Sequence, residues 1–147
     1  MKVGQTIPSA CLLDGEVTPT PNLRQDIYPI LRTSQRMVIA ANILREQDGV
    51  AVLYPDCKRG FGVRVVHFQN GRAPGKNLSV GLLYLAPGGV LEPHSHENEE
   101  VYFIMEGKGN GHFGLGKPID MEAGMYMHLP PNAEHGLENT GNEMMKV

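Results

Sequence analysis

Short apolar runs alternate with glycine- and proline-rich turns along the second half of the chain. From residue 78 onward, LSVGLLYLAPGG, EVYFIMEGKGNG and GMYMHLPPN each hold one strand-length apolar run that ends in Gly, Pro or Asn. Such regular spacing of short strands is typical of an antiparallel barrel or sandwich. The sequence therefore predicts an all-β domain, with a turn at Gly88-Gly89.

The first half of the chain is less regular. Residues 1–35 are rich in Pro, Thr and Gln, and we interpret them as an irregular arm. Residues 50–54 and 62–68 are predicted strands, each closed by turn residues. Residues 37–44 stay open between helix and strand, because Ser34 could cap a helix but the run is apolar all round.

Length and charge restrict the classes of partner. A chain of 147 residues suits one domain, and its net charge of −3 offers no basic surface. We therefore expect no nucleic acid and no anionic membrane as partners. The chain has no apolar stretch of membrane-spanning length, and its N-terminus lacks the apolar run of a signal peptide, so we expect a cytoplasmic protein.

The stretch HSHENEE carries the candidate chemistry. His94 and His96 are two residues apart, so in a strand their side chains share a face at a spacing of about 6.8 Å. Glu100 follows across the next bend and can supply a carboxylate oxygen. Two imidazoles and one carboxylate suit a first-row divalent metal with open coordination positions. His135 comes after a Pro-Pro-Asn turn that could point it back toward the pair as a fourth ligand.

Together the two segments resemble the two-part motif of the cupin superfamily. The first segment matches G-x5-H-x-H-x3-E-x6-G from Gly88 to Gly107 at every position. The second, from Gly124 to Asn139, matches G-x5-P-x-G-x2-H-x3-N except at Asn132, where the family usually has Gly. Asn is the residue that best replaces Gly in a left-handed turn, so the departure does not weigh against the fold.

The resemblance implies a double-stranded β-helix, the jelly-roll barrel of the cupins. It also implies one divalent transition-metal ion (Fe, Mn, Ni, Zn or Co), bound by His94, His96, Glu100 and His135. We expect an N-terminal extension over 1–35 and a cupin barrel over 36–147, with core motifs in 80–139.

Two further residues are candidates for acid–base catalysis. Tyr102 lies two residues beyond Glu100 and shares its face, so its phenol could act beside the metal, or simply pack in the barrel core. Glu92 shares a face with His94 by the same count and could transfer a proton, or lie in water at the rim. The Glu100-Val-Tyr102 pattern resembles cupin lyases that cleave dimethylsulfoniopropionate, in which a tyrosine at this offset serves as base.

We expect a metal-dependent enzyme acting on a small oxygen-rich molecule: a carboxylate, a keto or enol compound, or a sugar derivative. Dioxygenation, decarboxylation, isomerisation and β-elimination all stay open, because one metal site can host many reactions. The alternatives are a non-catalytic small-molecule-binding or sensor cupin and a structural barrel without metal. Sensor cupins usually carry a DNA-binding helix pair, which residues 1–75 do not predict.

The end of the barrel suggests self-association. After Asn139 the predicted last strand has only the four residues MMKV, which would leave an open sheet edge. The N-terminal arm could cover this edge, a partner subunit could add a strand there, or the chain could end earlier than its natural relatives. We expect a homodimer through the N-terminal arm, in which residues 1–50 exchange or pack across the interface.

Overall fold

The chain divides into two units, Met1–Asn42 and Ile43–Val147, which we describe separately. In the first unit, β1 (Ile30–Thr33) and β2 (Arg36–Ile39) form an antiparallel hairpin. The segment left open between helix and strand thus begins in a strand. Most of the expected arm lies outside the described residues. The computed structural model describes residues 30–33, 36–39, 41–114 and 116–147.

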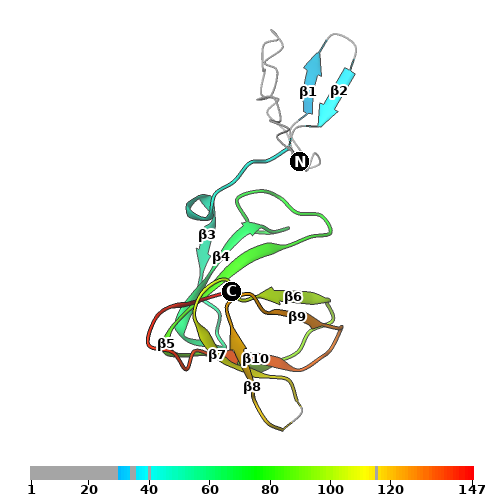
Figure 1. Cartoon of the computed structure of the whole chain (residues 1–147). Coiled ribbons are helices and arrows are strands. Elements are labelled where there is room, and N and C mark those ends of the chain that lie inside the picture. Colours follow the sequence, from blue (N-terminus) through cyan, green and yellow to red (C-terminus); the bar gives the residue numbers. More distant parts are fainter. Residues whose placement is uncertain (1–29, 34–35, 40, 115) are drawn as a thin grey trace, which may run out of the picture. The chain divides into compact units, whose positions relative to one another are not determined.

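The second unit is built almost entirely of strands (Figure 1). Its elements are η1 (Glu46–Asp48), β3 (Val50–Val52), β4 (Cys57–Val66), β5 (Val80–His94), β6 (Glu100–Phe103), β7 (Lys108–His112), β8 (Ile119–Glu122), β9 (Tyr126–Leu129), β10 (His135–Glu138) and β11 (Met145–Lys146). The fold is a jelly-roll barrel, so the all-β prediction is confirmed. In the described part of the chain, no helix is long and apolar enough to cross a membrane.

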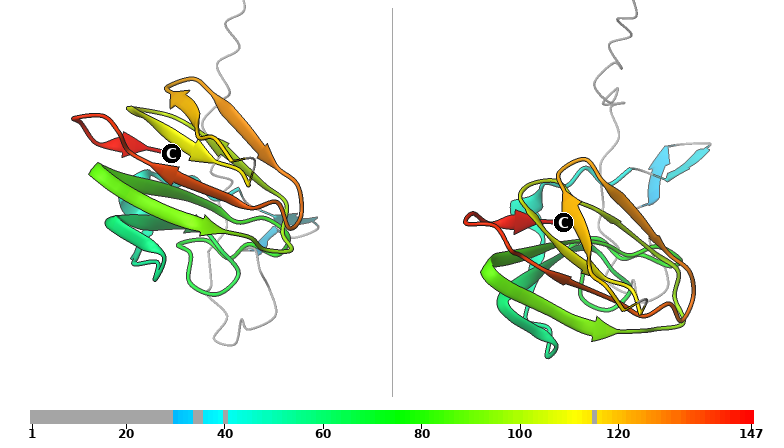
Figure 2. Two further views of the ribbon diagram at one scale, coloured as in Figure 1. Left: turned by 90° about the horizontal axis from the view of Figure 1, so that it is seen from below. Right: turned by 60° about the horizontal axis from the view of Figure 1, so that its bottom comes forward.

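Two sheets enclose the core. The larger sheet runs β3-β4-β5-β10-β7-β8, with β11 also paired to β5, and β6 pairs with β9 in a second sheet. All of these named strand pairs are antiparallel. In Figure 2, β4 and β5 lie on one side of the barrel, β7, β8 and β9 lie on the other, and β10 runs between β5 and β7. The long strand β5 pairs with three other strands and is the central element of the barrel.

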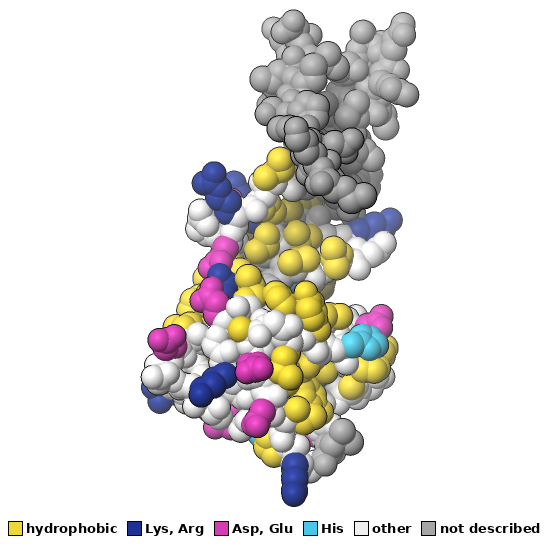
Figure 3. All heavy atoms as spheres, in the orientation of Figure 1, with side chains coloured by type: hydrophobic (Ala, Val, Ile, Leu, Met, Phe, Trp, Pro, Cys, Tyr) yellow, Lys and Arg dark blue, Asp and Glu magenta, His cyan; other side chains and the backbone are white. Residues whose placement is uncertain are grey.

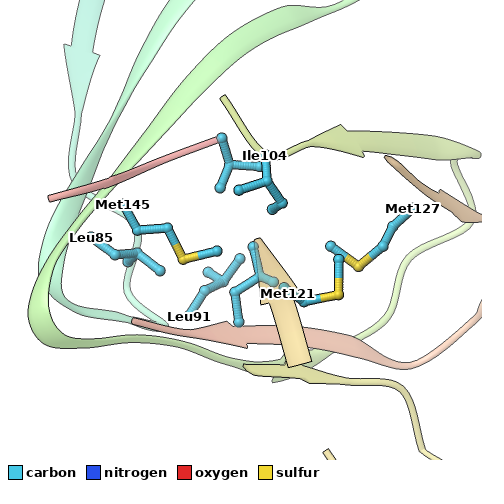
Figure 4. Packing of buried hydrophobic residues seen from close by; sticks show 8 residues of the cluster. Leu85, Leu91, Ile104, Met121, Met127 and Met145 are labelled. Atoms are coloured by element: carbon cyan, nitrogen blue, oxygen red, sulfur yellow. The ribbon is translucent and has the colours of Figure 1, made fainter. Parts of the chain in front are cut away.

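Apolar side chains from both layers fill the space between them. The labelled side chains in Figure 4 point toward one another from β5, β8, β9, β11 and the segment after β6. Flexible methionine side chains fill irregular gaps well, which explains their number here. The buried cluster contains Leu85, Leu91, Ile104, Met121, Met127, Leu137, Met145 and Val147.

The expected turn at Gly88-Gly89 is wrong, because β5 continues through it as a bulge. On β4, Lys58 and Gly60 are two residues apart, but their partners on β5 are Val90 and Leu85. Gly88 adopts a φ of 69° inside this bulge. Backbone bonds to Asn139 stabilise it: the Gly88 N–H donates to the Asn139 carbonyl (3.0 Å), and the Asn139 N–H donates to the Gly89 carbonyl (2.9 Å). These hydrogen bonds hold the two glycines within the strand, where they form a bulge instead of a turn.

A second irregularity lies where β5 pairs with β10. His135 faces His94 and Leu137 faces Leu91, so three steps on β5 match two on β10. The extra residue shifts the alternation of side chains between the two sheet faces. As a result, Leu91 packs in the core, and His94 three residues later also faces inward.

The C-terminal strand is paired on both sides, so the expected open edge is wrong. On one side of β11, the backbones of Val147 and Leu83 exchange two hydrogen bonds of 2.8 and 2.9 Å. On the other side, the Lys146 carbonyl accepts from the Met105 N–H (2.8 Å) and the Lys146 N–H donates to the Glu106 carbonyl (3.0 Å). Met145 is fully buried. A strand of two residues therefore closes the gap between β5 and the segment after β6.

Charged and apolar side chains are mixed on the face drawn in Figure 3. Lysine, arginine, aspartate and glutamate are dispersed over it rather than gathered by sign. Several large apolar side chains of the described barrel are exposed, among them Leu53 and Phe68. This face therefore has no concentrated charge of either sign.

Candidate metal centre

Three histidines meet where two neighbouring strands come together. His94 ends β5, His96 follows it, and His135 opens β10 directly opposite His94. The ring centroids of His94 and His135 are 4.4 Å apart, those of His96 and His135 are 5.0 Å apart, and those of His94 and His96 are 5.8 Å apart. One ring nitrogen from each histidine lies within 4.8 Å of the other two. His135 lies 39 positions after His96 in the chain, so the fold brings it to a pair of histidines that is distant in sequence.

Backbone carbonyls orient all three rings in the same way. A carbonyl can only accept, so each Nδ1 carries the proton, and each Nε2 presents a lone pair. Such bonds to the second ring nitrogen are the usual support of a metal-binding histidine. The bonds run from His94 Nδ1 to Glu92 O (2.9 Å), His96 Nδ1 to Asn98 O (2.8 Å) and His135 Nδ1 to Ala133 O (2.8 Å).

The Nε2 atom of His135 indicates what kind of group the cluster could hold. His135 is 1% exposed, and its Nε2 has no hydrogen-bond partner in the described structure. Glu100 Oε2 lies 3.3 Å from it, but this contact does not have the geometry of a hydrogen bond. Glu100 Oε2 is also 3.1 Å from His96 Nε2. With protons on Nδ1, these groups are all acceptors, and a cation would satisfy them together.

The donor set fits a transition metal. Three imidazole nitrogens could hold a first-row divalent ion, and a carboxylate oxygen lies beside two of them. The calcium and magnesium sites of proteins use oxygen ligands instead. The residues thus match in kind the group that the sequence motif implies.

A left-handed turn joins the two halves of the motif. Asn132 has a φ of 64°, so the prediction that asparagine occupies the usual glycine position in that conformation is confirmed. Its backbone N–H donates to the carbonyl of His96 over 2.8 Å, and the Ala133 N–H closes the turn on the Pro130 carbonyl over 3.0 Å. The same turn leads into His135, so it fixes one histidine relative to another.

Tyr102 lies between the core and the imidazoles. Its ring stands edge-on to that of His135, with 5.6 Å between the ring centroids, and it also packs against the buried core cluster. Burial raises the pKa of the Tyr102 phenol, and the nearby charge of Glu100 and the phenol of Tyr54 raise it further. The hydroxyl is therefore protonated at neutral pH. A role for Tyr102 in acid–base catalysis stays a prediction.

Glu92 does not share the face of His94. The extra residue in β5 leaves Glu92 on the outer side of the sheet, where its carboxylate forms an ion pair with Lys58. The expectation of a common face was wrong because it assumed unbroken alternation along the strand. The backbone carbonyl of Glu92, rather than its side chain, contacts His94.

One residue near Tyr102 was missed from the sequence. Tyr54 follows β3, outside the two-part motif, and its phenol contributes to the raised pKa of Tyr102. A usable signal was present in GFGVR, because glycines at alternate positions of a strand often mark a close approach by another group.

The chain resembles several known proteins in this region. Residues 81–147 match the family model described as a cupin domain. Auxin-binding protein 1 of Arabidopsis thaliana is 35% identical over 81 residues, a match that covers 49% of this chain and 40% of that protein. The dimethylsulfoniopropionate lyase DddW of Ruegeria pomeroyi is 34% identical over 61 residues, covering 42% of this chain and 40% of that protein. The chain thus matches less than half the length of these relatives.

Solved structures agree on the fold. The polyketide cyclase RemF of Streptomyces resistomycificus superposes with a TM-score of 0.63 at 17% identity, covering 73% of this chain and 75% of the cyclase. Identity this low supports a shared fold and says nothing of a shared reaction.

Proposed function

We propose that this chain, of which residues 81–147 match a cupin domain model, is a metal-dependent enzyme acting on a small carboxylate or enolisable molecule. The observation that supports this most directly is the buried Nε2 of His135. Its lone pair faces two other imidazoles and a carboxylate, and no group in the described structure donates a hydrogen bond to it.

The ion would be held by His94, His96, Glu100 and His135. Four protein ligands leave two positions of an octahedral ion for a bidentate oxygen ligand, which is the basis for proposing a carboxylate or keto acid. When bound, such an ion would polarise a substrate oxygen and stabilise negative charge that develops on it.

Tyr102 favours reactions that move a proton. Its protonated phenol lies beside His135 and Glu100, where it can donate a proton to a substrate oxygen. To remove a proton from carbon it would first have to lose its own proton, which a cation bound by the neighbouring ligands would favour. Elimination and isomerisation need such a group, whereas dioxygenation does not depend on it. Similarity to a dimethylsulfoniopropionate lyase, together with the Glu100-Val-Tyr102 pattern, supports elimination as the first reaction to assay.

The surrounding core restricts water. Ile104, just after β6, and Leu129, at the end of β9, are both buried. Met127 of β9 lies directly opposite Tyr102 of β6. Exclusion of water strengthens the interaction of a protonated phenol with a developing charge.

A second candidate is a binding protein without turnover. Auxin-binding protein 1, one of the similar proteins, is named for binding, and Tyr102 packs against the core as a purely structural aromatic residue would. In this case the metal and Glu100 would hold a carboxylate ligand, and no proton would move.

One experiment separates these functions. The purified protein is loaded with Mn²⁺, Fe²⁺, Ni²⁺ or Zn²⁺, its metal content is measured, and small carboxylates, including dimethylsulfoniopropionate, are tested for binding and turnover. We expect one ion per chain, loss of the ion in His94→Ala, and its retention with loss of turnover in Tyr102→Phe. His128→Ala is a matched control, because His128 is exposed and paired with Glu99.

The outcomes point in different directions. Metal and ligand binding without turnover would support the binding protein. A chain that takes up no metal under any of these conditions would refute both functions.

A further inference from the structure

The outer face of β4 and β5 carries an apolar groove. Gly60 of β4 lies opposite Leu85 of β5, whose side chain is fully buried in the core. The next pair, Phe61 and Tyr84, therefore points away from the core, because neighbouring residues of a strand face opposite sides. The two rings stack, with 4.8 Å between centroids and 14° between planes. Both line a groove of about 380 Å³, a volume within the range of roughly 300–1,000 Å³ that is common for small-molecule sites.

Other apolar side chains of the groove are open to solvent. Leu53 is 83% exposed and Met144 is 45% exposed, and both line the groove. Ala51 and Ala86 also line it, and their short side chains leave room for an occupant. Grouped apolar side chains on a protein surface often mark a binding site, because a bound apolar group removes them from water.

Arg59 gives the groove its charge. Among the described residues that line the groove, it is the only charged one. Arg59 lies in the bulge opposite Gly88 and has a φ of 54°, a left-handed conformation that is uncommon for a residue with a side chain. A Cβ on Gly88 would lie 3.4 Å from Arg59 Nη1, so the guanidinium rests against this glycine. Its side chain forms no ion pair and no hydrogen bond with any residue that the structure describes.

A second cation near the stacked rings is already neutralised. Lys146 Nζ lies 5.5 Å from the centroid of the Tyr84 ring and forms an ion pair with Glu46. The Tyr84 hydroxyl donates to the same carboxylate. An anion that enters the groove would therefore be attracted to Arg59 rather than to Lys146. The planar guanidinium matches a carboxylate in particular, through two parallel hydrogen bonds.

The lining favours a hydrocarbon over a polypeptide as the apolar part of the occupant. Tyr84 pairs with Phe61 on one side and with Lys146 of β11 on the other, so the sheet backbone beneath the groove is already hydrogen-bonded. A peptide laid across the rings would leave its own N–H and C=O groups without partners against apolar side chains. A hydrocarbon tail has no such groups.

We propose that this groove binds a small amphipathic carboxylate with the chemistry of a medium-chain fatty acid. The hydrocarbon tail covers the rings of Phe61 and Tyr84, and the carboxylate pairs with Arg59. The stacked rings face outward, whereas the histidine cluster lies at the inner face of the barrel, so this is a second site. The inference does not rest on the proposed metal-dependent function.

The test compares octanoate with octanol, which has the same tail without the charge. Binding is measured calorimetrically on the full chain, both on metal-free wild type and on His94→Ala, so that a carboxylate at the histidine cluster does not contribute. We expect octanoate to bind both proteins equally, and octanol to bind roughly 10-fold more weakly or worse, the usual effect of losing a charge-assisted hydrogen bond. The methyl NMR signals of Leu53 and Met144 should shift when octanoate is added.

Three variants locate the site. Arg59→Gln should lower the affinity for octanoate to that for octanol and leave octanol unchanged. Arg59→Gly should do the same and keep or raise the thermal midpoint, because glycine suits the left-handed backbone at this position. Leu53→Glu should weaken both ligands, because it places a negative charge among the apolar side chains of the groove.

Arg72→Gln is the matched control. Arg72 is an exposed arginine between β4 and β5 that does not line the groove, so its substitution should change the affinity for neither ligand. The thermal midpoint is measured for every variant, which separates a folding defect from a binding defect.

Several results would overturn the inference. They are equal affinities for octanoate and octanol in the wild type, no loss of octanoate affinity in Arg59→Gln, and a wild type that binds neither molecule. Light scattering that shows a dimer dissociated by Leu53→Glu would assign the groove to a second copy of the chain. NMR contacts of the Leu53 methyl groups with another segment of the same chain would assign it to that segment. The metal-dependent function would stand after any of these results.

Discussion

The contact between Gly62 and Tyr54 leads to a prediction about stability. Gly62→Ala should destabilise the wild type but stabilise a protein that lacks the Tyr54 ring. Gly62→Ala would place a methyl group 2.8 Å from Cζ and Oη of Tyr54 and closer still to Cε2, and the three nearest heavy atoms all belong to that ring. Such a clash forces the ring to move. Overpacking of this kind typically costs about 1–3 kcal/mol of unfolding free energy.

Removal of the ring should reverse the effect. In a Tyr54→Ala background the three nearest obstacles to the new methyl group are gone. Alanine in a strand is favoured over glycine by about 0.5–1 kcal/mol, because glycine loses more backbone entropy on folding. Gly62→Ala should then stabilise the protein, and the coupling between the two sites should be about 1.5–4 kcal/mol.

The assay is urea or thermal unfolding of the four proteins of this double-mutant cycle. For a folded unit of about 100 residues, a change of 1 kcal/mol shifts the thermal midpoint by about 4 °C or more. If Gly62→Ala stabilises the wild type as much as it stabilises Tyr54→Ala, the close approach of ring and strand does not exist.

Three further predictions concern other parts of the barrel. His135→Gln should abolish metal binding and, with it, the rise of about 2.7 kcal/mol in unfolding free energy that an ion at 100 times its dissociation constant gives the wild type, measured by thermal scans with and without metal. Asn139→Ala should cost about 3 kcal/mol in urea unfolding, since the fully buried side chain makes three hydrogen bonds to the backbone at about 1 kcal/mol each; an unchanged midpoint would contradict this. Hydrogen bonds from Lys146 and then Tyr84 hold the pKa of Glu46 below its ordinary value, so its contribution to stability is full above that value and is lost as the pH falls through the lowered pKa. A carboxyl signal of Glu46 that titrates at or above pH 4.5 in an NMR titration would refute it.

The all-β fold and the pairing of His94 with His96 were predictable for the same reason, because both depend only on spacing within short segments. Strand-length apolar runs between turn residues indicate an all-β fold at any register, and the spacing within HSHENEE brings His94 and His96 to one face of a strand. His135 could be matched to them only through the resemblance to a known motif. Spacing along the chain does not reveal which distant strand will become a neighbour.

The errors share one cause. Each depended on which residues face each other across neighbouring strands, and the pattern of apolar and polar residues does not show this. Glu92 was assigned to the face of His94 by counting in twos, and the extra residue in β5 reverses that count. Tyr54 was overlooked because its position against Gly62 follows only from the pairing of β3 with β4. The apparent open edge at β11 is closed by backbone hydrogen bonds to Met105 and Glu106. Because these bonds involve only backbone atoms, no residue type in the sequence indicates them.

Between Leu91 and His94, the extra residue in β5 reverses which side chains face inward. The same strand therefore supplies side chains to the core and a histidine to the cluster. Leu85 and Leu91, at odd-numbered positions, are buried in the core, whereas His94 and His96, at even-numbered positions, belong to the histidine cluster. Deletion of the single residue Pro93 would turn the imidazole pair outward while leaving the packing up to Leu91 in place. A family built on this barrel could therefore abandon or regain its chemistry through a one-codon length change, without redesigning its interior.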